Sequence, residues 1–367
     1  MAFQSNNENL NPSLFENKSN DIVNKEDKWK AVSHLQKCIR RGWVSEVEQA
    51  VRLCYKIDAA YTRYRLSVIA FEDIAGGNPK LIAQSFQKGW SKKIIEELGG
   101  EDWLVEQATQ WAMGPKDRLA SDLGACVYYK SEFEEKYGLF ESLSIEKALD
   151  IAWSDAPWAH RALALWRAFG TEQYPHPLLP KIKGDVDKVL QKNQELGISE
   201  AFNECIRAGS TQKEFAPVFL PLVALGLQKA EPELSVLPLE KNTPIWIGPW
   251  VSIALDKHTR EGQKALSWAW YHLHWKKEFE ALGATQQVAL DAIGKMQFWM
   301  EGGLLDKTPN YPFKKQVTME SRQNVFATWP FSAKQLYTIA GNVEMWNKAR
   351  FSVLGLPYPM NVKNMKI

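Results

Sequence analysis

The sequence predicts an all-α fold, in which a helical N-terminal domain is followed by a second, mostly helical domain. Apolar residues recur at three- and four-residue spacing along most of the chain, whereas alternating, strand-like runs are few. Glycine and proline cluster between the periodic segments, where they end helices. The composition, with 45% hydrophobic and 24% charged residues, is that of an ordinary globular protein.

Three helices are expected to follow a polar N-terminal arm. Residues 1–26 are rich in asparagine, and we expect them to be disordered. The apolar spacing predicts two helices within residues 28–58, with a turn between them at Gly42, and a third helix over residues 59–75. The run Gly76-Gly77-Asn78-Pro79 is expected to stop that third helix.

Further helices are expected at 80–97, 101–113 and 117–130, because Gly99-Gly100 and Gly114-Pro115 interrupt the apolar pattern. The rest of the chain is expected to be helical over 144–230, 259–282 and 284–302. A proline-rich linker is expected over 231–249, and an irregular tail is expected from Thr308. The expected division of the chain is an arm, a collar-like domain defined below, a helical middle region and an aromatic-rich C-terminal region: 1–26, 27–135, 136–240 and 241–367.

A basic face is predicted on the first helix. At 100° per residue, Lys30, His34, Lys37 and Arg41 share one side, opposite an apolar stripe, and Arg40 adds a further cation. Residues 28–66 hold nine Lys and Arg against three Asp and Glu, a local charge of +6 in a chain whose net charge is +2. This face is a candidate contact for DNA phosphates; the alternative is a solvated face whose charges pair with neighbouring residues.

A polar network is predicted near the end of the third helix, where Arg65 precedes Glu72 and Asp73. Two adjacent carboxylates near a helix C-terminus oppose the helix dipole, so they need partners from elsewhere in the fold. We expect a buried network of arginine and carboxylates that pins adjacent helices. A role in catalysis or binding is the alternative.

The same segment carries a family resemblance. The run Ser33-His-Leu35-Gln-Lys37-Cys-Ile39-Arg40 is followed by Tyr61…Arg65-Leu66…Ala70-x-Glu72-Asp73-Ile74…Pro79 and, further on, by Leu98-Gly99 and Ala112-Met-Gly-Pro115-Lys116. Over residues 29–126 this pattern resembles the region that follows the ATPase module in the RarA/MgsA family, which is related to the Werner-helicase-interacting protein and to clamp loaders. The resemblance implies a helical collar that assembles subunits and presents them to DNA and partner proteins.

Several departures limit what the resemblance implies. Tyr64 stands where the family has a second arginine, and Ala75 stands where it has glycine. No G-x-x-x-x-G-K-[ST] motif occurs in the chain, so the residues that cradle nucleotide phosphates are missing and ATP hydrolysis is not expected. The resemblance therefore implies binding or assembly rather than an activity.

An aromatic stripe is predicted in the C-terminal half. Trp268, Tyr271 and Trp275 lie at positions i, i+3 and i+7 of one helix, beside Lys276 and Lys277. Aromatic rings beside cations are typical of surfaces that stack unpaired bases, and core packing is the alternative. The nearby Asp256, His258 and His272 could at most form an unrecognised enzyme centre; they supply too few ligands for a metal, and we expect no metal and no cofactor.

The sequence favours a non-catalytic accessory protein of DNA metabolism that binds DNA, most simply single-stranded DNA. A polymerase, helicase or AAA+ ATPase is the expected partner, together with self-association. The alternative is a scaffold or inhibitor that acts on a clamp-loader-like ATPase without touching DNA. Four dispersed cysteines and the lack of a long apolar segment favour the cytoplasm, or the host cytoplasm for a viral protein, and no membrane contact.

Overall fold

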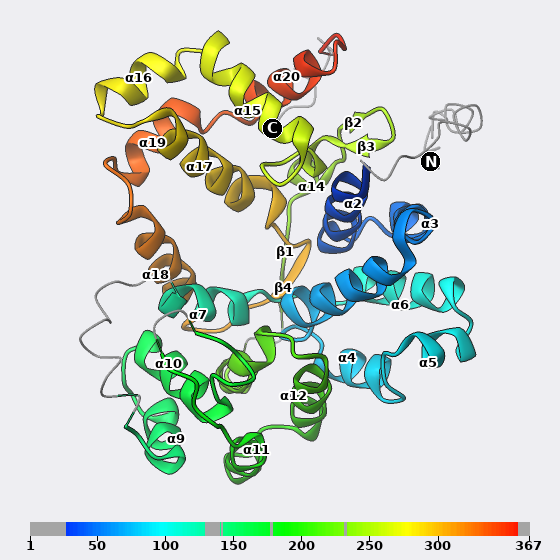
Figure 1. Ribbon diagram of the computed structural model, residues 1–367, viewed down its shortest axis with the longest axis vertical. Coiled ribbons are helices and arrows are strands. Elements are labelled where there is room, and N and C mark those ends of the chain that lie inside the picture. Colours follow the sequence, from blue (N-terminus) through cyan, green and yellow to red (C-terminus); the bar gives the residue numbers. More distant parts are fainter. Residues whose placement is uncertain (1–26, 129–139, 141, 177–178, 231–232, 359–367) are drawn as a thin grey trace, which may run out of the picture.

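The structure is a computed structural model that describes residues 27–128, 140, 142–176, 179–230 and 233–358 (Figure 1). The fold is all-α: helices make up most of the described residues, and the strands among them have two or three residues each. The predicted arm, residues 1–26, lies outside the described residues. No helix in the described part of the chain has the length and apolar character needed to cross a lipid bilayer.

The N-terminal helices follow the predicted order. Helix α2 (Lys28–Arg41) ends at Gly42, whose φ of 65° is readily adopted only by a residue without a Cβ atom. Helix α3 (Val44–Ile69) merges two predicted helices and kinks at Asp58, where the break between them was expected. A π-helical turn, η2 (Ala70–Ile74), then leads into the predicted stop.

The next segment contains one helix more than predicted. The Asn78 side chain accepts a hydrogen bond from the Leu81 N–H at 3.3 Å and so caps α4 (Pro79–Phe86). The predicted helix 80–97 is split at Gly89 into α4 and α5 (Lys92–Glu97). Helix α6 (Glu101–Met113) has the predicted bounds, and α7 (Leu119–Tyr128) follows it.

The middle of the chain forms the lower part of the molecule in Figure 1. Its helices are α9 (Ile145–Trp153), α10 (Trp158–Phe169), α11 (Val186–Glu195), α12 (Glu200–Gln212), η4 (Ala216–Phe219) and α13 (Leu220–Leu227). The predicted linker, 231–249, contributes one strand to each of two short antiparallel ribbons and holds α14 (Leu239–Asn242). Strand β1 (Leu234–Val236) pairs with β4 (Lys307–Pro309), and β2 (Trp246–Ile247) pairs with β3 (Trp250–Val251).

The C-terminal part lies at the top of Figure 1 and corrects two predictions. The helix expected over 259–282 is two helices, and the tail expected to be irregular from Thr308 is largely helical. The elements are η5 (Ser252–Ala254), α15 (Arg260–His272), α16 (Trp275–Ala281), α17 (Gln286–Gln297), η6 (Phe298–Gly302), α18 (Lys314–Phe326), α19 (Ala333–Ala340) and α20 (Val343–Val353). Side-chain caps at Ser332 and Asn342 start the last two helices in a segment where proline and asparagine had suggested loops.

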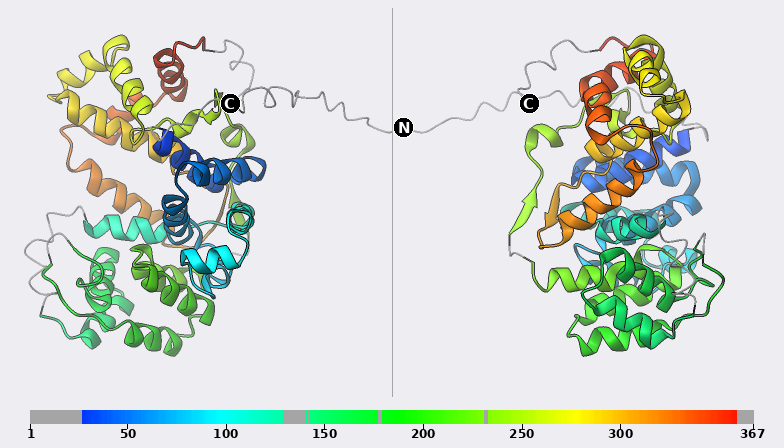
Figure 2. Two further views of the ribbon diagram at one scale, coloured as in Figure 1. Left: turned by 45° about the vertical axis from the view of Figure 1, so that its right-hand side comes forward. Right: turned by 90° about the vertical axis from the view of Figure 1, so that its left-hand side faces the viewer.

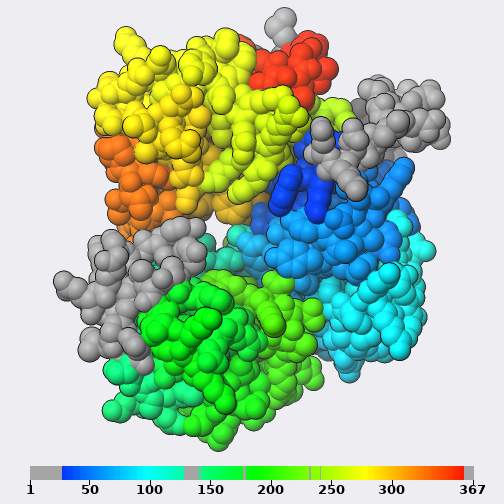
Figure 3. Space-filling model, viewed as in Figure 1, coloured from blue at the N-terminus to red at the C-terminus, as the bar shows by residue number. Residues whose placement is uncertain are grey.

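Two hydrophobic cores hold these elements together. The first runs through α2–α13 and is continuous across the expected boundary at 135/136, which itself lies outside the described residues. The second joins α15–α17 with α19 and α20. Helix α18 leaves this upper part and packs on α7, while α2 connects the two parts on the other side (Figure 2). A gap remains between the two parts in the space-filling view (Figure 3).

Candidate functional site

The basic face of α2 does not reach the surface, and the prediction that it contacts DNA there is therefore corrected. Its basic side chains are enclosed by the protein: His34, Lys37, Arg40 and Arg41 are buried, and Lys30 is partly buried. Residues between Lys241 and Gly302 contact this side of the helix, so that Lys37, Arg40 and Arg41 meet carboxylates and carbonyls instead of solvent. Lys30 pairs with Asp27 at 2.5 Å and with Glu261 at 3.2 Å.

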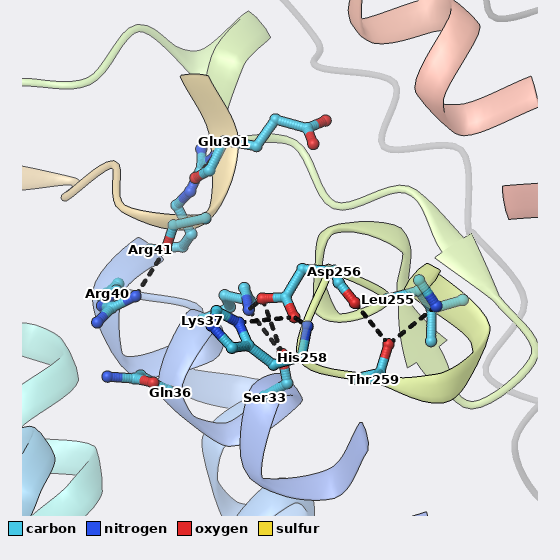
Figure 4. A network of polar contacts seen from close by, with 12 residues as sticks. Ser33, Gln36, Lys37, Arg40, Arg41, Leu255, Asp256, His258, Thr259 and Glu301 are labelled. Carbon is cyan, nitrogen blue, oxygen red and sulfur yellow. Dashed lines mark hydrogen bonds and ion pairs between the residues drawn. The ribbon is translucent and has the colours of Figure 1, made fainter. Parts of the chain in front are cut away.

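Lys37 is held by the loop that precedes α15 (Figure 4). Its Nζ donates to Ser33 Oγ at 2.6 Å and to Asp256 Oδ2. The other oxygen of Asp256 accepts from the His258 backbone N–H at 2.9 Å and lies 3.3 Å from the ring Nδ1 of His258. Burial alone would raise the pKa of Asp256, but the charge of Lys37 and the contacts with His258 hold it well below its ordinary value. Lys37 and Asp256 thus form a buried ion pair between α2 and the upper part.

The predicted network of arginine and carboxylates exists, but with different arginines. Asp73, whose side chain is fully buried, accepts from Arg40 Nε at 2.9 Å and also pairs with Arg118. Glu72 accepts from Arg118 Nη2 at 2.9 Å. Arg65 joins indirectly, because its Nη2 donates to Gln36 Oε1 at 3.2 Å while Gln36 Nε2 donates to Asp73 at 3.0 Å.

The aromatic stripe predicted on one helix is broken. Helix α15 ends at His272, so that Trp275 begins a new helix and points into the second core, where it is fully buried. Trp268 is partly buried and stacks on His272, with ring centroids 4.6 Å apart. Tyr271, Lys276 and Lys277 are exposed but no longer share a face with a tryptophan platform.

A different aromatic surface lies where α2 and α3 meet. We call Trp29, Tyr61 and Tyr64 the aromatic shelf. The Trp29 and Tyr61 rings meet edge to face at 5.8 Å, and Tyr61 and Tyr64 are also 5.8 Å apart. Trp29 is 56% exposed and Tyr64 is 55% exposed, so both present ring surface to solvent.

Cations accompany the aromatic shelf. Lys28 Nζ lies 3.8 Å above the Tyr61 ring while pairing with Asp58 at 2.8 Å. Arg65 is partly buried, and its Nε has no hydrogen-bond partner. Arg65 forms no ion pair with any described residue, although Glu214 interacts with it electrostatically and Glu72 lines the same cleft. Beside the ring faces, the shelf therefore has Lys28, paired with Asp58, and Arg65, which interacts with Glu214 electrostatically without a direct ion pair among the described residues.

A cleft of about 270 Å³ opens beside Trp29. Its walls combine the rings of Trp29 and Phe298 with polar and charged side chains of both signs, among them Arg65, Glu72 and Asp256. This volume is close to the lower end of the range for small-ligand sites, about 300 Å³. The cleft can therefore hold little more than one planar group between Trp29 and the polar wall.

Sequence reasoning missed the aromatic shelf, although a signal was present. Tyr64 departs from the arginine of the resembled family, and a surface aromatic in place of a cation is a change that favours stacking. Trp29 precedes the first buried residue of α2, Ala31, so its position in the helix does not indicate a role in the core.

The described residues contain no group of three or more His, Cys, Asp or Glu side chains placed to hold a metal ion. His272 contacts Trp268 rather than the pair formed by Asp256 and His258. No protein-family model, no curated protein and no solved structure matches this chain. The resemblance to the RarA/MgsA collar therefore rests on the sequence motifs alone.

Proposed function

We propose that this protein is a non-catalytic accessory factor of DNA metabolism that binds single-stranded DNA on the aromatic shelf. The observation that carries the proposal is the exposure of Trp29 and Tyr64 beside Tyr61, with Lys28 above the Tyr61 ring and Arg65 lining the cleft beside Trp29. Stacking of a base on an aromatic side chain contributes about 1–3 kcal/mol and does not depend on the base.

The chemistry of the shelf favours single strands over duplex. Paired bases hide their faces within the stack, whereas unpaired bases are free to lie on Trp29 and Tyr64. The adjacent cations would contact phosphates, and the cleft beside Trp29 offers room for one planar group. In line with the resemblance, we include self-association and a polymerase, helicase or AAA+ ATPase as partner. The dispersed cysteines favour a cytoplasmic setting.

A fluorescence titration with a labelled oligothymidylate, repeated at two salt concentrations, tests the proposal. We expect salt-sensitive binding by the wild-type protein and at least about a tenfold loss for Trp29→Ala/Tyr64→Ala, since two stacked bases are lost. Tyr271→Ala is the matched control, because it removes an aromatic ring of similar exposure from α15, on an element that carries none of the shelf residues. The proposed binding site on the shelf is contradicted if the wild type does not bind the oligonucleotide, or if only Tyr271→Ala loses affinity.

A second candidate function is a scaffold that acts on a clamp-loader-like ATPase without DNA contact. It is favoured by β1, which pairs with β4 along one edge and exposes apolar side chains on and after the strand: Leu234, Val236 and Leu239. An edge strand with exposed apolar residues is suited to pairing with a strand of a partner. Inhibition of such an ATPase by the wild type but not by Val236→Lys, with no DNA binding by either, supports this alternative.

A further inference from the structure

A groove on α18 has a charge pattern that the aromatic shelf does not explain. The groove, of about 610 Å³, lies between the first turns of α18, the loop 310–312 and Lys229 after α13. Four cations line it, Lys229, Lys314, Lys315 and Arg322, and the described lining residues include no carboxylate. Glu320, on the same helix, lines the neighbouring hollow instead.

One of the four cations is neutralised and serves to build the groove. Lys314 Nζ lies 3.0 Å from the buried Asp117 Oδ2 and 3.0 Å from the Pro309 carbonyl oxygen, and it also contacts Thr308. Tyr311 donates its hydroxyl to the same Asp117 oxygen at 2.8 Å. These contacts fix the loop against α18 and give the groove a rigid floor.

The other three cations remain available to a ligand. Lys229 and Lys315 are exposed, and neither forms an ion pair with any described residue. Arg322 is partly buried with its guanidinium 5.6 Å from the Trp299 ring, and its Nε has no hydrogen-bond partner. The nearby carboxyl of Asp122 is bonded to Thr318 Oγ1 at 2.7 Å. Asp122 also attracts Arg322 electrostatically, whereas no carboxylate of the described residues pairs with Lys229 or Lys315, so an anion in the groove would be stabilised by these two lysines.

The spacing of the cations sets the kind of anion. Lys315 and Arg322 are seven residues apart, which is about 10 Å along the helix axis. Because both side chains leave one face of α18, a chain of phosphates laid along the helix can contact both at once, and the Asn310 amide is a further donor.

We infer that the groove formed by Lys229, Lys315 and Arg322 binds a run of linked phosphate groups. The backbone of a nucleic acid and inorganic polyphosphate share this chemistry. The site lies on other elements than the aromatic shelf, so the inference does not depend on stacking at Trp29 and Tyr64.

The test compares two charge reversals of equal size in the full-length protein. Binding of fluorescently labelled polyphosphate and of single-stranded DNA is measured over a series of salt concentrations for Lys229→Glu/Lys315→Glu. The matched control is Lys276→Glu/Lys277→Glu, which reverses two exposed lysines on α16. All four positions are exposed, and thermal unfolding checks that both variants fold.

We expect at least a tenfold loss of affinity for the groove variant and a shallower dependence of log K on log salt, by about 0.7 for each lost phosphate contact on a single strand. The control should bind as the wild type does. Binding of DNA alone identifies a nucleic acid backbone as the ligand, and binding of polyphosphate alone identifies the free polyanion. Absence of salt-dependent binding to both probes, or an equal loss in both variants, overturns the inference.

The two proposals can fail separately in this experiment. Trp29→Ala/Tyr64→Ala is expected to leave polyphosphate binding unchanged, because polyphosphate has no base to stack. If this variant loses polyphosphate as strongly as the groove variant does, the groove is not the site.

Discussion

At the residue scale, the most constrained side chain is Asp73, which lies between Arg40 and Arg118 with no exposure to solvent. Burial alone would raise its pKa, but the two arginines hold the pKa below its ordinary value. The stability that Asp73 contributes is thus present above the ordinary pKa of an aspartate and is lost as the pH falls below it.

We predict that Asp73→Ala lowers the free energy of unfolding by about 3–5 kcal/mol, because it leaves two buried arginine charges short of a partner. Chemical denaturation at neutral pH measures the loss. Glu72→Ala is the matched control, since the Glu72 side chain is 29% exposed and water can replace it. Similar losses for the two variants would mean that Arg118, bound by both, dominates the network.

His34 gives the protein a pH-dependent stability. Its ring is enclosed by Trp246 and Trp250, with centroids 5.7 and 5.9 Å away, and its Nδ1 accepts from the Val251 N–H at 3.4 Å. Burial, together with the charge of Lys37, lowers the pKa of His34 to about 4. The unfolded chain takes up a proton near pH 6.5, whereas the folded protein does so only near pH 4.

We therefore predict that the contribution of His34 to stability is complete above pH 6.5 and falls as the pH drops from 6.5 to 4, at up to about 1.4 kcal/mol per pH unit. The measurement is the difference in free energy of unfolding between wild type and His34→Gln across this range. His176, whose pKa burial also lowers to about 4, is present in both proteins and cancels. A difference that does not change with pH would show that His34 is not held neutral.

At the element scale, the end of α2 depends on Gly42. An alanine Cβ there would lie 2.1 Å from Asp306 Oδ2, and Asp306 accepts from the fully buried Lys116 at 2.6 Å. Gly283 has a similar positive φ of 75°, but a Cβ there meets no atom within 4 Å. The two glycines therefore separate the cost of the backbone conformation from the cost of the contact.

We predict that Gly283→Ala lowers stability by about 1–2 kcal/mol, the cost of the left-handed conformation. Gly42→Ala should cost clearly more, because Asp306 has to move away from Lys116. Thermal and chemical unfolding of both variants provide the comparison. Equal losses would show that Asp306 moves without disturbing Lys116.

Local signals explain which helices the sequence could predict. Helix α6 was predicted with its correct bounds because Gly100 and Gly114 flank a single segment whose apolar residues have helical spacing. The break between α15 and α16 was missed, since the residues from Trp268 to Trp275 keep a helical spacing through a non-helical Leu273. The tail was missed because its helices are short and their caps, Ser332 and Asn342, resemble loop residues.

At the scale of the whole molecule, the sequence could not predict where α2 lies. A helix with one apolar and one basic face has the pattern of a surface helix. Its basic face is buried because Asp256, Glu301 and Gly302, more than 200 residues later, provide a carboxylate and carbonyl groups. Pairings at such separation leave no periodic signal, so the ion pair between Lys37 and Asp256 and the burial of the basic face emerged only from the fold.

The ion pair between Lys37 and Asp256 is one of the bonds that attach the second core to α2. Asp256 lies on the loop before α15, and the same loop is tied to α20, because Arg350 Nε donates to the Leu255 carbonyl at 3.1 Å. Removing the carboxylate leaves Lys37 buried without a counter-charge and releases the loop. Local opening of the upper part should then require less free energy than opening of the first core.

We predict that Asp256→Ala accelerates amide hydrogen exchange in α15 and α20, while exchange in α6 and α10, within the first core, changes little. Because a buried pair can be replaced by apolar groups at small cost, Lys37→Met/Asp256→Leu should recover much of the protection. Lys276→Ala serves as the control, because Lys276 is an exposed residue on α16, a helix that packs into the second core. Equal acceleration in α6 and α15 would instead mean that the two cores unfold as one cooperative unit, with the ion pair stabilising the whole molecule.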